Sequence, residues 1–191
     1  MQDQKNEMSD GMALQAETLV EEWFNRNGYF TICGIKENID EIDILASKNT
    51  DINTWDCIYC EVQVSVRPVG YISKLTKELM EELKGLTKTS AKLRNEQQIK
   101  ECAIAWVRNK YETDKKVKLR NRFMLNANWK YILVHGNVKD QKELIHISQQ
   151  GVGLIPFSQI LDDLCTKQTS IDISGSSAGD LIEIINFMKV K

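Results

Sequence analysis

Acidic and amide side chains alternate with apolar ones in two short segments of the chain. Residues 41–47 (EIDILAS) contain Asp43, and residues 58–67 (IYCEVQVSVR) contain Glu61 and Gln63 on one side of the alternation. Successive side chains of a β-strand point to opposite faces, so each segment predicts a strand with one apolar and one polar face. The polar, turn-rich residues between the segments predict that the two strands are antiparallel neighbours. Asp43 and Glu61 are therefore candidates for one shared site.

A third acid, Glu17, falls at the border of the apolar stripe of a predicted first helix. Carboxylates that converge from several elements suit Mg²⁺ or Mn²⁺, because these hard ions prefer oxygen ligands and keep several waters. We expect Asp43 and Glu61 to bind the ion, with the backbone carbonyl of Val62 as a further ligand. The Gln63 amide could then position the water that attacks a phosphodiester, while the ion lowers the pKa of that water.

These residues resemble a known family. An acid in a first helix, Ile42-Asp43 at the start of a strand and Glu61-Val62-Gln63 in the next strand are similar to the motif of the PD-(D/E)XK nuclease superfamily. The resemblance implies the restriction-endonuclease-like fold and a Mg²⁺-dependent or Mn²⁺-dependent nuclease that acts on DNA, of a restriction or repair type.

The same resemblance implies a role for each matching residue. Asp43 and Glu61 would bind the metal and Glu17 would assist them. Gln63 occupies the position that usually holds the catalytic lysine. Glutamine can donate a hydrogen bond to an anion but brings no positive charge, so it stabilises that anion less than lysine does.

Other interpretations stay open. Asp43 and Glu61 could be exposed acids, as most are, although an acid in a strand of a covered sheet needs a partner or a metal. The missing lysine favours a second function, a nucleic-acid-binding module that keeps the scaffold without turnover. A third is an interaction or immunity subunit whose basic stretch contacts an acidic protein.

Charge is distributed unevenly along the chain, although the net charge is only −2. Residues 1–66 hold four Lys/Arg and thirteen Asp/Glu, whereas residues 84–122 hold twelve Lys/Arg and four Asp/Glu. Such a basic stretch suits a polyanion, since lysines and arginines neutralise phosphates without reading sequence. The residues that we expect to contact nucleic acid are Ser65, Arg67, Lys84, Lys88, Lys92, Arg94, Lys110, Lys115, Lys116, Lys118, Arg120 and Arg122.

Hydrophobic periodicity predicts an α/β fold, a mixed central sheet flanked by helices. The predicted helices cover residues 10–27, 72–86, 90–103, 139–150, 158–164 and 180–188, and the predicted strands cover residues 29–33, 41–47, 58–67, 129–134 and 152–157. The basic residues 110–123 are predicted to form a loop with a strand inside it. We expect a flexible leader over residues 1–9, one domain over residues 10–168, and a linker with a last helix over residues 169–191.

Composition narrows the class of protein. The 191 residues, 42% of them hydrophobic, suffice for one globular domain. Neither a membrane span nor a secretory signal is apparent, so we expect a cytoplasmic protein with reduced thiols. Cys57 and Cys60 form a lone CxxC, which does not indicate a zinc site. His135 and His146 receive no catalytic role, and a homodimer is left open.

Overall fold

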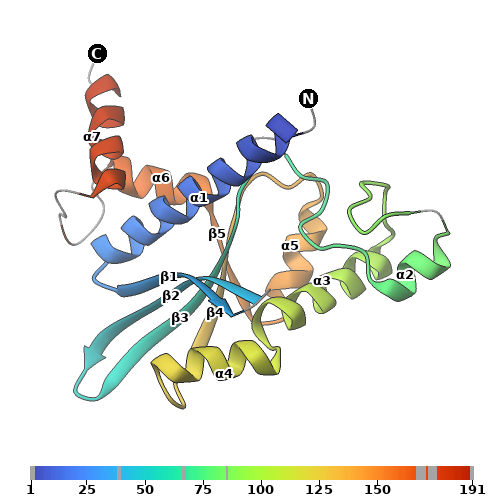
Figure 1. Ribbon diagram of the computed structural model, residues 1–191, viewed down its shortest axis with the longest axis horizontal. Helices are drawn as coiled ribbons and strands as arrows, with labels where there is room; N and C mark the ends of the chain where they lie inside the picture. The colour runs from blue at the N-terminus through green and yellow to red at the C-terminus, as the bar shows by residue number, and fades with distance from the viewer. Residues whose placement is uncertain are drawn as a thin grey trace.

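A single five-stranded sheet forms the centre of the computed structural model, which describes residues 3–37, 40–65, 68–84, 86–166, 171 and 176–189 (Figure 1). The strands lie side by side in chain order, as β1 (Phe30–Glu37), β2 (Asp40–Asp51), β3 (Thr54–Gln63), β4 (Trp129–His135) and β5 (Val152–Pro156). β1, β2 and β3 pair antiparallel, whereas β3, β4 and β5 pair parallel. The predicted α/β fold with a mixed, helix-flanked sheet is confirmed.

Helices α1 (Asp3–Arg26) and α6 (Phe157–Cys165) cover one face of the sheet, and α7 (Ser177–Lys189) packs against these two helices (Figure 1). Helix α1 begins at Asp3, before the predicted start at residue 10. Apolar residues at helical spacing bring one stripe of α1 and of α6 onto the sheet. The buried core on this face consists of Ala16, Val20, Phe24, Ile44, Ala46, Ile58, Cys60, Val62, Val134, Ile160, Leu164 and Ile182.

The opposite face carries α3 (Glu96–Tyr111), α4 (Asp114–Phe123) and α5 (Gln141–Ser148), with the short α2 (Lys77–Glu82) packed on α3 (Figure 1). The buried core on this face consists of Ile42, Leu45, Tyr59, Ala103, Trp106, Val107, Tyr111, Leu119, Leu133, Val138, Leu144, Ile147 and Val152. Because Cys60 and Val62 of β3 face α1, the alternation directs Tyr59 and Glu61 toward α3 and α4. The site acid Glu61 therefore points into a covered face.

The prediction of a loop with a strand over residues 110–123 is wrong. Helix α3 runs on to Tyr111, and α4 starts at Asp114 after the N-cap residue Thr113, whose hydroxyl accepts a hydrogen bond from Lys116 N. Two of the residues that α4 buries are cations, Lys116 and Arg120. An apolar pattern alone does not reveal a helix that buries charged side chains.

Helices α2 and α3 also differ from the predicted ranges. Residues 72–73 are not helical, because Ile72 N and Ser73 N each donate to the buried carboxylate of Glu143 at 2.7 Å. Helix α3 begins at Glu96 because Asn95 and Gln98 form a capping box there.

The cysteines are free thiols, as predicted. Cys60 belongs to the core under α1, whereas Cys57 Sγ lies 3.1 Å from Met124 Sδ beside α4, so the CxxC residues face opposite sides of β3. No helix in the described part of the chain has the length and apolar character needed to cross a membrane.

Candidate active site

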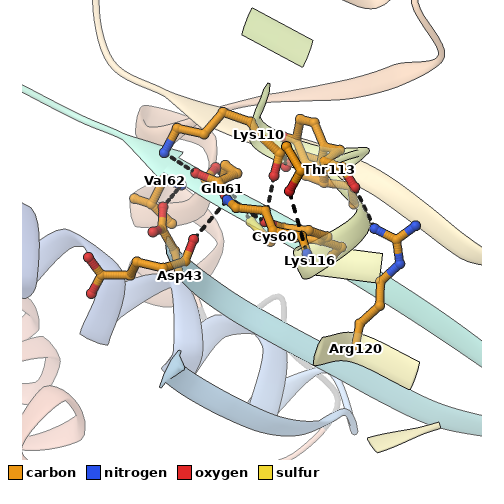
Figure 2. A network of polar contacts seen from close by, with 12 residues as sticks. Asp43, Cys60, Glu61, Val62, Lys110, Thr113, Lys116 and Arg120 are labelled. Atoms are coloured by element: carbon orange, nitrogen blue, oxygen red, sulfur yellow. Dashed lines mark hydrogen bonds and ion pairs between the residues drawn. The ribbon is translucent and has the colours of Figure 1, made fainter. Parts of the chain in front are cut away.

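β2 and β3 stop pairing at the point where Asp43 and Glu61 would face each other. Their last pair before this point is Ile44 with Cys60, and the same antiparallel register would place Asp43 opposite Glu61. Instead, Val62 N donates a hydrogen bond to Asp43 Oδ2 at 2.7 Å, so a side chain replaces the backbone acceptor (Figure 2). The two strands therefore separate at these two acids, and the charge of Glu61 lies near enough to raise the pKa of Asp43.

The backbone is also distorted on the other side of Asp43. In the β1–β2 register Gly34 lies opposite Asp43, and its φ of 62° is in the left-handed region that favours glycine. Across this distortion Ile44 packs under α1, whereas Ile42 packs under α3 and α4. A strand with one apolar face over residues 41–47 would place Ile42 and Ile44 together, so that prediction is wrong here, because regular alternation breaks at the candidate ligand.

Asp43 is buried and only 8% exposed. Its pKa rises from 3.8 to about 7, chiefly because burial disfavours the charged form and also because Glu61 lies nearby. The Lys110 ammonium and the Val62 N–H partly oppose this rise. Asp43 therefore exchanges its proton near neutral pH, and a nearby cation would favour its charged form.

Glu61 is fully buried, with 0% exposure, and both of its oxygens have partners. Lys110 Nζ lies 2.5 Å from Oε2, while Lys116 Nζ lies 3.3 Å and the Tyr59 hydroxyl 2.9 Å from Oε1. Figure 2 shows Lys110 and Lys116 beside Glu61. A buried carboxylate is costly without such partners, so the two ammonium groups are what makes its burial tolerable.

The two lysines differ in how they are held. Lys116 is 4% exposed and donates to three acceptors, namely the Glu41 carbonyl oxygen at 2.8 Å, the Tyr59 hydroxyl at 2.9 Å and Glu61 Oε1. Lys110 is 31% exposed and donates to Glu61 Oε2. Burial alone lowers the pKa of Lys110, but Glu61 and Asp43 raise it overall, so its ammonium stays charged.

A tight connection between two helices places both lysines on the same carboxylate. Lys110 lies in the last turn of α3 and Lys116 in the first turn of α4, and the residues between them form the junction. Tyr59 of β3 connects the strand to this junction, because its hydroxyl also lies 2.6 Å from the carbonyl oxygen of Lys110. The sheet and the two helices therefore meet at Glu61.

Glu17 lies at the edge of this cluster. It is half-buried, and its pKa is raised by burial and by the charges of Glu41 and Glu61. The described residues contain no group of three or more His, Cys, Asp or Glu side chains arranged to hold a metal ion. The structure therefore brings Glu17 near the acidic pair without making it part of a common ligand set.

A cleft of about 1080 Å³ opens beside the site. Its basic lining consists of five lysines, Lys74, Lys77, Lys88, Lys110 and Lys116, and its acidic lining consists of Glu41 and Glu78. Gln63 also lines the cleft, so the residue at the position of the usual catalytic lysine lies in its wall. Because Lys110 and Lys116 are paired with Glu61, three further lysines face two acids, and this small excess of positive charge suits a polyanion.

The predicted nucleic-acid contacts are placed in different ways. Lys88 and Lys110 line the cleft, while Lys116 reaches it but is almost completely buried. Arg120 is buried, with Nη1 donating to the Tyr111 carbonyl oxygen and Nη2 to the Tyr131 hydroxyl. Arg94 is buried too and donates to the Ser73 carbonyl oxygen. The prediction that Lys116, Arg94 and Arg120 contact phosphates at the surface is therefore wrong. Their charged groups are buried and donate to other groups of the protein.

The remaining predicted contacts are exposed or undescribed. Arg67 lies outside the described residues. The exposed predicted contacts that do not line the cleft are Ser65, Lys84, Lys92, Lys115, Lys118 and Arg122.

The donor set fits a hard divalent ion. Magnesium usually takes one or two protein carboxylates and completes its shell with water and substrate oxygens, so Asp43 and Glu61 suffice. The N–H and C=O groups of one residue leave a strand on the same side, so the Val62 carbonyl faces Asp43 as its N–H does. An ion bound by Glu61 would compete with the Lys110 ammonium for Oε2.

Sequence reasoning missed two parts of this site. The first is Tyr59, whose position two residues before Glu61 on the same face of a strand indicates that they are neighbours. The second is the role of the two lysines, which the sequence predicts to be phosphate ligands. Only the packing of α3 and α4 on β3 shows that Lys110 and Lys116 neutralise Glu61.

Comparisons with protein families and curated proteins found no match to this chain.

Proposed function

We propose that this protein is a metal-dependent nuclease that hydrolyses phosphodiester bonds in nucleic acid, with DNA as the first substrate to test. The supporting fold is a helix followed by three antiparallel strands and then, after α3 and α4, a strand parallel to the third. This order agrees with the restriction-endonuclease-like fold that the sequence motif implies. A cytoplasmic location belongs to the same proposal.

One observation carries the proposal. Two adjacent strands separate at a pair of buried acids, Asp43 and Glu61, beside a cleft lined by five lysines. Phosphodiester hydrolysis needs the same two elements, namely oxygen ligands for a divalent ion and positive charge for the backbone phosphates.

Each residue of the site has a separate role in this proposal. Asp43 and Glu61 would hold Mg²⁺ or Mn²⁺, with the Val62 carbonyl beside them. The ion supplies Lewis-acid chemistry, because it polarises the phosphoryl group and neutralises developing charge. Gln63 donates a hydrogen bond to an oxygen at the reacting phosphate. The exposed lysines of the cleft, Lys74, Lys77 and Lys88, hold the phosphates on either side of it.

A cleavage assay tests the proposal. Supercoiled plasmid, linear duplex and single strands of DNA and RNA are incubated with wild type and with Mg²⁺ or Mn²⁺. We expect nicking or cleavage that Asp43→Asn lowers by at least about 100-fold, since a metal ligand acts directly in the transition state. Asparagine keeps an oxygen that can accept from Val62 N, so the fold survives.

Glu22→Gln provides the matched control. Glu22 is another buried acid, paired with Arg26 at 2.6 Å on α1, away from the cleft. Its replacement should leave cleavage unchanged. Equal cleavage by wild type and Asp43→Asn would reject the assignment.

A specific observation favours one alternative, a nucleic-acid-binding module without turnover. Both oxygens of Glu61 already have ammonium partners, and glutamine stands at position 63. This function predicts salt-dependent binding of nucleic acid, no cleavage with any divalent ion, and no rise in Tm when the ion is added.

A further inference from the structure

The Lys110 ammonium sits on the carboxylate oxygen that a divalent ion would use. Its distance to Glu61 Oε2 is 2.5 Å, and Glu61 has no exposure to solvent. A divalent ion on that oxygen would repel this ammonium group. Binding of the ion would therefore favour movement of the Lys110 side chain, which also lines the cleft.

Of the two lysines that contact Glu61, Lys110 is the one that can move without breaking several buried hydrogen bonds. Lys116 is buried and has three acceptors, so its release would leave the Glu41 carbonyl and the Tyr59 hydroxyl without a donor. Lys110 Nζ has Glu61 as its acceptor, is partly exposed, and lies in the lining of the cleft. The flexible four-carbon stem of lysine lets an ammonium group reorient at small cost.

We propose that Lys110 is an exchangeable counter-ion: a divalent ion displaces its ammonium from Glu61 into the cleft, where it becomes an additional contact to a nucleic-acid phosphate. The inference rests on the proposed metal and nucleic-acid binding, and it concerns regulation of that site. Metal and polyanion then strengthen each other's binding, because each favours the same position of Lys110.

The exchange makes two predictions for Lys110→Gln. Removing the competing ammonium should tighten the binding of Mn²⁺ to the protein alone by about 10-fold, measured by isothermal titration calorimetry. The salt dependence of DNA binding should change only when metal is present. Each phosphate contact contributes about 0.9 to the slope of log K against log salt for duplex DNA.

The binding experiment uses a fluorescein-labelled 20-base-pair duplex with and without Ca²⁺, and a denaturing gel verifies that the probe stays intact. Without metal, wild type and Lys110→Gln should have equal slopes, since Lys110 is then tied to Glu61. With Ca²⁺, the wild-type slope should be steeper by about 0.9. Lys74→Gln is the matched control, because Lys74 lines the same cleft and is exposed. Its slope should be lower than that of wild type by a similar amount in both conditions.

Each contrary result has a distinct meaning. The exchange is overturned if the salt-dependence slopes of wild type and Lys110→Gln differ by the same amount with and without metal. It is also overturned if both proteins bind Mn²⁺ with equal affinity. Lys110→Arg, which keeps the charge, should retain weak metal binding, and Tm measurements confirm that each variant is folded. Metal binding by neither protein overturns the exchange and the nuclease together. The exchange signature without cleavage supports this inference and rejects turnover.

Discussion

The ion pair between Lys116 and Glu61 should contribute strongly to stability. Lys116→Met removes an ammonium group that is 4% exposed and donates to Glu61 and to the Tyr59 hydroxyl, while methionine keeps an unbranched apolar stem. Removing one partner of a buried ion pair costs about 3–5 kcal/mol, because the other charge stays buried. Glu61 retains Lys110 and Tyr59, so we expect the lower end, about 3 kcal/mol of unfolding free energy.

Urea unfolding of four proteins measures this contribution. The proteins are wild type, Lys116→Met, Glu61→Gln and the double variant, which together form a double-mutant cycle. We expect a coupling of about 2 kcal/mol, since the double variant leaves no unpaired buried charge from this pair. Lys118→Met is the control on the same helix, because Lys118 is exposed, and it should change stability by less than about 0.5 kcal/mol.

Additivity would refute this reasoning. If the two single effects sum to the double effect within about 0.5 kcal/mol, Lys116 and Glu61 do not interact in the folded protein. A loss of stability in Lys116→Met no larger than in Lys118→Met would lead to the same conclusion.

Three further predictions follow from the acids and from the distorted strand. Burial raises the pKa of Asp43 to about 7, above its value in the unfolded chain. Its favourable contribution to the free energy of unfolding is therefore complete below about pH 4 and is lost as the pH rises through 7. Chemical unfolding from pH 4 to 8 should show that wild type loses stability relative to Asp43→Asn, and parallel curves for the two proteins would contradict this. Glu143→Ala should cost about 3 kcal/mol in urea unfolding, because Ile72 N and Ser73 N lose a buried acceptor; Glu143→Gln, which keeps one acceptor oxygen, should cost less. Gly34→Ala should cost about 1–2 kcal/mol in thermal unfolding, because the φ of Gly34 is 62°. No atom beyond the chain neighbours lies within 4 Å of an added Cβ, so the cost is backbone strain. Gly153→Ala is the control, since Gly153 has no such φ, and equal losses of stability in both variants would exclude strain as the cause.

Local patterns predicted the two strands that carry Asp43 and Glu61. The alternation in residues 41–47 and 58–67 identifies two strands, and the turn between them makes these strands neighbours, as the β2–β3 ladder shows. From that register alone Asp43 and Glu61 come together. Alternation failed at Ile42, where the backbone of β1 and β2 departs from regular geometry.

Local patterns were not sufficient for the lysines around Glu61. In a stretch as basic as residues 84–122, each lysine is most simply interpreted as exposed, since single cations are seldom buried. Lys116 is buried because β3 supplies a carboxylate and a hydroxyl to it from more than fifty residues earlier in the chain. The same long-range contact explains α4, whose helical character rests on buried cations as well as on Leu119.

The hydrogen bond from Val62 N to Asp43 has a consequence for how descendants of this chain would diverge. One carboxylate joins two strands and is also the proposed ligand, so selection for a folded protein alone would preserve an oxygen at this position after activity had gone. Aspartate in a related sequence would then be poor evidence of an active enzyme. Asparagine, which retains the acceptor and lacks the charge, is the substitution that would mark an inactive lineage.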